Sequence, residues 1–211
     1  MKNAGHIAGK TILTFGISSI VFWAVGFGFI FGDGAGLSKF IGLSDFFYSG
    51  YDLEGVGLSG AVFFLFQTAF AGISITIAFG GFAERAKMGV YVIFAVLFSV
   101  IVYPPIAHWI WGGGWLADHG KQDFAGSTVV HLTGAMAAFA ATILLKPRIG
   151  KYNKDGSANN LYGHNQVYTA LSVLLLWVGW FGFNAGSTVA VDEGFFGFVA
   201  VNTNLAAAAG T

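Results

Sequence analysis

Residues Met88 to Ile110 read MGVYVIFAVLFSVIVYPPIAHWI, an almost uninterrupted apolar run from which the kind of fold can be inferred. A helix needs about 20 mostly apolar residues to cross the hydrocarbon core of a bilayer, and this stretch supplies them. Pro104 and Pro105 near its end predict a kink or a stop there, because proline cannot continue the hydrogen-bond ladder of a helix. The stretch therefore predicts a membrane-spanning helix.

Five further apolar segments flank this one and qualify, or nearly qualify, as spans: residues 12–31, 61–83, 124–145, 167–185 and 195–209. The composition agrees, since 55% of the 211 residues are hydrophobic and only 9% are charged. A soluble domain averages about 25% charged residues. We therefore predict an all-α membrane protein, a polytopic bundle of transmembrane helices in which residues 1–211 form a single domain. The same composition disfavours a soluble enzyme.

The lysines and arginines fall mostly on one side of the predicted spans, with only Lys39 and Lys121 on the other. Because such residues stay in cytoplasmic loops, we expect a multi-pass protein of the cell membrane with both chain ends in the cytoplasm. The acidic residues of the opposite side are Asp33, Asp45, Asp52, Glu54, Asp118, Asp123, Asp192 and Glu193. An acidic outer face would suit the collection of cations, although the ordinary solubility of loops explains it equally well.

Several classes of chemistry find no support in the sequence. The net charge is zero, so no global field favours nucleic acid. There is no HExxH zinc pair, no GxSxG elbow and no P-loop. The five histidines show no tight ligand spacing, and haem ligation by two of them stays open without support from composition. We expect no metal, no cofactor and no enzymatic activity.

His131 is the most conspicuous polar residue, because it lies inside the predicted span 124–145. An ionisable side chain there costs a few kcal/mol unless it faces a partner or a cavity. It is either a histidine satisfied by a neighbouring helix or part of a functional site. Asp123, just before the same span, can accept hydrogen bonds from the first helical turn. A buried carboxylate at that place would also raise the local affinity for a cation.

Aromatic residues make up 17% of the chain. Trp111 precedes three glycines at an outer helix end, Phe66 and Phe70 share one helical face, and Phe183 lies near the hydroxyl of Ser187. An aromatic ring attracts a partly desolvated cation by roughly 0.5–2 kcal/mol. Core packing is nevertheless the commoner role of such rings.

Four segments together closely resemble the signature sequences of the ammonium transporter and Rhesus family. They occur in the family's order and are FGGFAER (79–85), HWIWGGG (108–114), DFAGSTVVH (123–131) and GWFGFNAGS (179–187). Residues 3–32 also resemble the family's second helix. The resemblance implies an eleven-helix fold of two inverted halves, usually in a homotrimer, with one pore through each subunit.

The resemblance also implies roles for individual residues. Trp111, Phe70 and Ser187 would form an outer ammonium site, and Phe70 and Phe183 would be the gate rings below it. Asp123 would support this site electrostatically without touching the ion. Ammonia would then pass through an apolar pore in the bilayer.

His131 would be the first of two pore histidines, and the second would lie beyond Thr211. By the same resemblance the chain lacks the family's first helix and stops within the seventh, so we expect a fragment that does not enclose a complete pore alone. Three functions stay open at this point: transport of ammonium or ammonia, sensing of ammonium by a receptor of the same fold, and a truncated piece without transport of its own.

Overall fold

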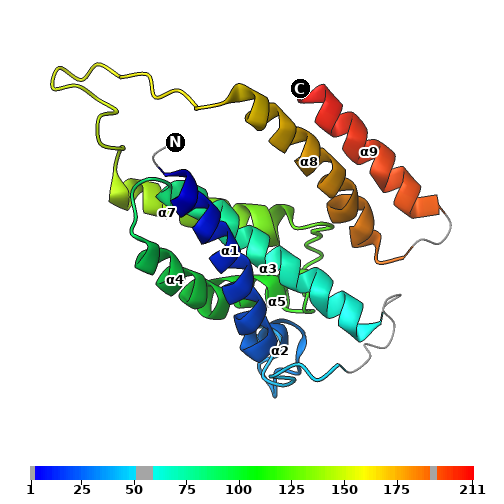
Figure 1. Ribbon diagram of the computed structural model, residues 1–211. Coiled ribbons are helices and arrows are strands. Elements are labelled where there is room, and N and C mark those ends of the chain that lie inside the picture. The colour runs from blue at the N-terminus through cyan, green and yellow to red at the C-terminus, as the bar shows by residue number, and fades with distance from the viewer. Residues whose placement is uncertain (1–2, 51–58, 191–193) are drawn as a thin grey trace. The chain divides into compact units, whose positions relative to one another are not determined.

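The computed structural model describes residues 3–50, 59–190 and 194–211, and in these ranges the regular elements are helices, apart from one isolated β-bridge (Figure 1). It divides into two compact units. The first comprises the described residues 3–50 and 60–159, and the second comprises 160–190 and 194–211. Five charged residues that entered the prediction of orientation lie outside the described residues: Lys2, Asp52, Glu54, Asp192 and Glu193.

The first span is longer than its apolar run. Helix α1 (Ala4–Val21), the π-helical turn η1 (Phe22–Gly26) and α2 (Phe27–Phe31) form one continuous helix of 28 residues. It starts eight residues before the predicted residue 12, because α1 packs against α3 (Gly60–Phe82) and α4 (Met88–Leu97). Lys10 is buried in this packing, with its ammonium 5.4 Å from the centre of the Phe79 ring.

The third span has the predicted limits, but the proline pair does not stop it. Helix α4 continues through the π-helical turn η2 (Phe98–Val102) into α5 (Tyr103–Ile110). The amide of Tyr103 donates to the carbonyl of Phe98, and Pro104 and Pro105 fall in the first turn of α5. Proline is tolerated there because the first amides of a helical segment need no partner within it. A short helix, α6 (Trp115–Asp118), follows.

The core of the first unit is the contact between α3 and the span that consists of the π-helical segment η3 (Ser127–Leu132) and α7 (Thr133–Leu145). Glycines allow the two backbones to approach. A Cβ atom at Gly134 would lie 2.6 Å from the carbonyl oxygen of Ser74, and one at Gly81 would lie 2.7 Å from the Cα of Ala138. Small residues at helix contacts are typical of membrane bundles, where close packing replaces the hydrophobic effect.

This contact gives a first testable prediction. Gly81→Ala should lower the stability of the bundle by about 2 kcal/mol, because the new methyl group overlaps the backbone of α7. Gly80→Ala is the matched control, since the neighbouring glycine is exposed and nothing lies within 4 Å of its Cβ position. Thermal unfolding of both variants in lipid nanodiscs measures the difference. Equal unfolding midpoints would show that α3 and α7 are not in close contact.

The second unit consists of α8 (Gln166–Asn184), the 3-10 turn η4 (Ala185–Thr188) and α9 (Phe195–Ala209). Asn165 caps α8, since its side-chain oxygen accepts from the amides of Val167 and Tyr168. Helices α8 and α9 run antiparallel side by side, linked by a 3.0 Å hydrogen bond from the Trp177 indole to the Asn204 side chain (Figure 1).

By length and composition, five helical segments of the described chain can cross a membrane: 4–31, 60–82, 88–118, 127–145 and 166–188. Helix α9 has 15 residues and is shorter than a complete span. The fourth segment starts at Ser127 instead of residue 124, because the residues just before it form a cap, described below.

Candidate functional site

An aromatic pair lies near the end of α5. The rings of Phe70, on α3, and Trp111, at the end of α5, have centroids 5.6 Å apart and planes inclined by 70°. Phe66 meets Phe70 edge to face at 4.6 Å on the same helix, as its spacing of four residues predicts. Phe70 is buried, and Trp111 is half-buried. The structure thus brings together two of the three residues proposed for the outer site.

The indole of Trp111 has a fixed orientation. Its Nε1 donates a 2.6 Å hydrogen bond to the backbone carbonyl of Asp123. Because this bond occupies the one polar group of the indole, a ligand can meet the side chain only through the ring. A cation is the ligand that the electron-rich face of such a ring attracts.

The carboxylate of Asp123 is saturated by the chain itself. Its Oδ1 accepts from the amides of Gly126 and Ser127 at 2.8 Å and from the Ser127 hydroxyl at 3.1 Å. Its Oδ2 accepts from the amides of Thr128 and Val129, both at 2.8 Å. These bonds use the lone pairs of both oxygens, so the carboxylate caps the start of η3 and has no oxygen left for a direct ligand.

The same bonds control the ionisation of Asp123, which is 8% exposed. Burial raises the pKa of this carboxyl group, but the hydrogen bonds from the Val129, Thr128 and Gly126 amides and the Ser127 hydroxyl outweigh it, so that the pKa lies below its ordinary value. Asp123 is therefore a fixed negative charge beside Trp111 at neutral pH.

Residues that the sequence reasoning did not single out shape this cap. Gly126 has a φ of 105°, and a Cβ atom there would lie 2.5 Å from the Cγ2 of Val130, so only glycine fits. The Gly126 carbonyl accepts from the amides of both Val130 and His131. On the opposite side, the hydroxyl of Ser74 donates to the Val130 carbonyl at 3.0 Å, which ties α3 to η3. The feature of the sequence that could have indicated this cap is the glycine at position 126, near the start of the predicted span 124–145.

His131 lies within η3, where its amide bonds five residues back to Gly126. π-helical turns occur frequently at functional sites, because they rotate the side chains that follow. The imidazole is exposed at the surface of the first unit, and the described residues do not enclose it.

Phe183 and Ser187, the other two candidate residues, belong to the second unit. Both are half-buried, and the Ser187 hydroxyl donates a 2.6 Å hydrogen bond to the carbonyl of Phe183. This bond uses the hydroxyl proton and leaves the oxygen able to accept from a donor such as ammonium.

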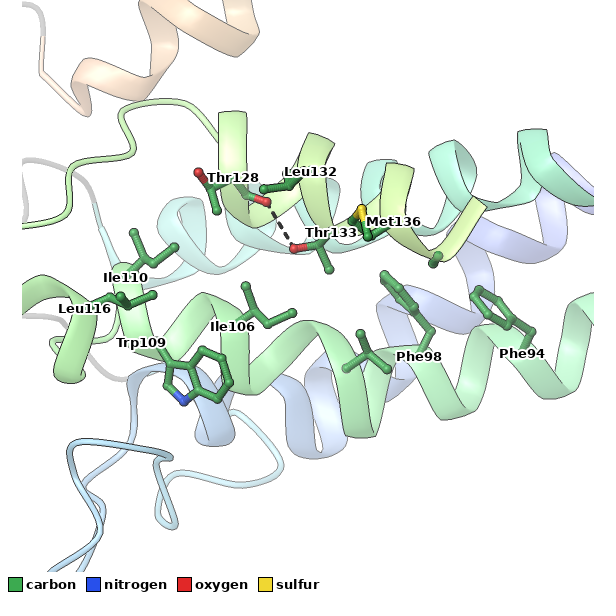
Figure 2. A pocket seen from close by; sticks show the side chains of 12 residues that line it. Phe94, Phe98, Ile106, Trp109, Ile110, Leu116, Thr128, Leu132, Thr133 and Met136 are labelled. Carbon is green, nitrogen blue, oxygen red and sulfur yellow. Dashed lines mark hydrogen bonds between the residues drawn. The ribbon is translucent and has the colours of Figure 1, made fainter. Parts of the chain in front are cut away.

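An apolar groove of about 470 Å³ lies between the α4–α5 span and the η3–α7 span (Figure 2). Phe94, Phe98 and Trp109 line one side, and Leu132 and Met136 line the other. One of its few polar groups, the Thr133 hydroxyl, already donates to the Thr128 carbonyl at 3.0 Å. The groove contains none of the candidate site residues and offers nothing to hold a cation.

The described residues contain no group of three His, Asp or Glu side chains that could hold a metal ion. What the first unit offers instead is a pair of rings beside a buried, ionised carboxylate at one end of a set of membrane helices. These features are those of a polytopic helical membrane protein that has an aromatic pair beside a fixed negative charge. A family model described as Ammonium Transporter Family matches residues 1–211, and the chain belongs to this family.

Individual relatives agree with this assignment. The chain is 40% identical to Ammonium transporter Amt2 of Archaeoglobus fulgidus over 222 residues, covering 99% of this chain and 46% of that protein. It is 45% identical to the Ammonium transporter of Bacillus subtilis over 150 residues, covering 71% of this chain and 35% of that protein.

Solved structures show the same fold. A structure titled Sensor Amt Protein matches with a TM-score of 0.91 and 43% identity, covering 99% of this chain and 52% of that one. The crystal structure of Candida albicans Mep2 matches with a TM-score of 0.78 and 29% identity, covering 92% and 43%. The chain spans about half the length of the curated relatives it matches. The predicted family and the predicted class of an all-α polytopic membrane protein are confirmed.

Proposed function

We propose that the protein moves ammonium across the membrane, by recruiting the cation at an outer aromatic site and conducting it as ammonia. One observation carries the proposal: the Phe70 and Trp111 rings lie 5.6 Å apart, with the indole held by the backbone of an ionised Asp123. Membership of the ammonium transporter family over residues 1–211 supports the choice of ion.

In this proposal, Trp111 and Phe70 bind ammonium through cation–π contact, and the Ser187 hydroxyl accepts one of its N–H groups. Phe70 and Phe183 form the gate below the site. Asp123 stabilises the bound cation at a distance, because its own oxygens are occupied by the cap of η3.

His131 lines the path of ammonia in the same proposal. Ammonium and potassium are similar in size, so a site of fixed dimensions separates them poorly. Ammonium can give up a proton and cross an apolar path as neutral ammonia, whereas potassium cannot. A neutral imidazole offers a hydrogen-bond partner to ammonia without holding a cation.

The wider setting is also part of the proposal. Residues 1–211 form one transmembrane domain, with both of their ends on the cytoplasmic side as the positive-inside rule predicts. The intact protein lies in the cell membrane as a homotrimer, as its family resemblance implies, and it needs no cofactor or nucleic acid.

Flux through liposomes that contain the intact protein tests the proposal. We expect uptake of ammonium or methylammonium, and His131→Ala should change its rate or its selectivity against potassium several-fold, because the imidazole lines the path. His164→Ala is the matched control, since His164 is an exposed histidine in the loop just before α8. Absence of ammonium flux from the intact protein would refute transport, and unchanged flux and selectivity in His131→Ala would refute the role of this residue.

A second candidate is ammonium sensing, which the likeness to the structure titled Sensor Amt Protein favours. A sensor of this kind would bind ammonium at the same aromatic site and report it to a signalling domain. Sequencing the gene beyond residue 211 separates the two functions: a kinase-like extension favours the sensor. Expressing residues 1–211 alone tests the third possibility, a piece without transport of its own, which robust uptake would refute.

A further inference from the structure

His108, on α5, is a fully buried ionisable side chain near the candidate site, with an exposure of 1%. Both of its ring nitrogens meet backbone carbonyl oxygens. Nδ1 lies 2.6 Å from the oxygen of Ile30, on α2, and Nε2 lies 2.7 Å from the oxygen of Ser38, in the loop that follows α2. These are hydrogen-bond distances for both nitrogens.

A carbonyl oxygen can only accept a hydrogen bond, so each of these contacts requires a proton on the ring nitrogen. A neutral imidazole carries one N–H, and its other nitrogen would direct a lone pair at a carbonyl oxygen in a site that is buried from solvent. Only the imidazolium, which has two N–H groups, satisfies both contacts. We propose that His108 is a doubly protonated cross-link between α2 and the outer loop, and that this cross-link positions Trp111 for the ligand.

The cross-link belongs to a larger brace. Three successive carbonyls of the loop, those of Ser38, Lys39 and Phe40, accept hydrogen bonds from residues 108–115. The donors are His108, the amide of Trp115 at 2.9 Å from Lys39, and the Trp109 indole at 2.9 Å from Phe40. The motif His108–Gly114 thus uses its first two side chains to hold the loop.

The brace fixes the backbone that carries Trp111. The carbonyl of His108 accepts from the amides of Gly112 at 3.1 Å and Gly114 at 3.0 Å, and the Trp111 amide donates to Ala107 at 2.7 Å. A Cβ atom at Gly112 would collide with the Ile30 carbonyl, the same oxygen that His108 binds. His108 therefore acts as a positioning residue, because it locks the turn from which the Trp111 ring projects.

The charges around α5 agree with a buried cation there. Two acidic residues, Asp33 and Asp45, belong to the braced loop, and Asp123 binds Trp111 from the other side. Lys39 is paired with Asp118 of α6 at 3.8 Å. The described segments packed around His108 therefore contain more carboxylates than ammonium groups.

The nitrogen NMR spectrum of the intact protein, labelled at its histidines and held in lipid bilayers at about pH 7, tests the protonation state. We expect one imidazole with two protonated ring nitrogens, and this signal should vanish in His108→Gln. His119 is the internal control, because it is exposed and only its Nδ1 meets a carbonyl, that of Trp115 at 2.7 Å. A spectrum in which His108 has one unprotonated nitrogen would overturn the cross-link. Should His108→Gln fail to fold, single replacements of the other histidines, among them His6, His119, His131 and His164, assign the signal by elimination.

The positioning role rests on the proposed function and needs a second measurement. In liposomes, His108→Gln should raise the KM for ammonium about tenfold with little change in the maximal rate, because the outer site is disordered and the pore is intact. Trp109→Phe, which removes one neutral bond of the same brace, should raise the KM much less. A KM equal to that of the unmodified protein in His108→Gln would overturn the role. The NMR result needs no transport, so failure of the proposed function and failure of the cross-link can be told apart.

Discussion

Replacing Asp123 with alanine should lower the stability of the protein by about 3 kcal/mol and reduce ammonium flux at least tenfold. The carboxylate accepts hydrogen bonds from four successive amides and one hydroxyl at the start of η3. Without it, these amides lose their acceptor, and the backbone of residue 123, whose carbonyl holds the indole of Trp111, loses the bonds that fix it to η3. Thermal unfolding in nanodiscs and flux in liposomes measure the two effects.

Asp155→Ala is the matched control for this variant. Asp155 also accepts bonds from an amide and a hydroxyl, both of Ser157, but it lies exposed in the loop between α7 and α8. Its replacement should leave the stability nearly unchanged. Equal effects of the two substitutions would contradict the view that the buried cap of η3 depends on Asp123.

The stability that Asp123 provides should also depend on pH. The pKa of its carboxyl group is lowered in the folded protein, so its contribution is complete above about pH 4, the ordinary value of an aspartate, and is lost as the pH falls through the lower folded value. Asp123→Asn should therefore flatten the decline of the unfolding midpoint in acid. If the unfolding midpoint of Asp123→Asn declined in acid as steeply as that of the unmodified protein, groups other than Asp123 would cause the decline.

Replacing Trp111 with leucine should raise the KM for ammonium about tenfold, because a cation–π contact of the size expected at a partly dry site is removed. Trp111→Phe should have a much smaller effect, since it keeps a ring beside Phe70 and loses only the bond from the indole to Asp123. The comparison therefore separates the role of the ring from the role of its N–H group. Measuring flux in liposomes at a series of ammonium concentrations gives the KM of each of the two variants.

Trp23→Leu is the control for loss of an indole in general. Trp23 lies in η1 and likewise donates its indole N–H to a backbone carbonyl, that of Tyr48 at 3.1 Å, but it is not part of the aromatic pair. Its replacement should leave the KM unchanged. If Trp111→Leu and Trp23→Leu raised the KM equally, the effect would be one of packing, and Trp111 would not bind the ion.

Much of the architecture follows from the sequence alone. The limits of α3 and of the α4–α5 span agree with the apolar runs within one residue, because the need for about 20 apolar residues is a local property of the chain. The family was also evident from four short motifs, which the match over residues 1–211 confirms. The roles of the site residues remain predictions, those of Trp111, Phe70 and Asp123 as well as those of Ser187, Phe183 and His131.

The errors have a common cause. The first helix already begins at Ala4, because its polar first turns pack against α3 and α4. The fourth helical segment begins only at Ser127, because the residues before it form the cap in which the Asp123 carboxylate accepts the first amides. The prolines of the third span do not stop it, because a π-helical turn shifts the register before them. Each difference between the predicted and the observed helix depends on packing against another segment or on a change of helical register, and a hydropathy pattern contains neither.

Apolar length and short motifs are properties of contiguous residues, so the amino-acid sequence was enough to predict a membrane protein, most of its helices and its family. The contact of Phe70 with Trp111, the bond from Ser74 to the π-helical segment, and the place of His108 between two carbonyls 78 and 70 residues away in the chain became known from the folded structure. The physical reason is that a backbone carbonyl is the same group at every residue. The packing of the helices determines which carbonyl a buried side chain meets, and this partner cannot be read from the residue types.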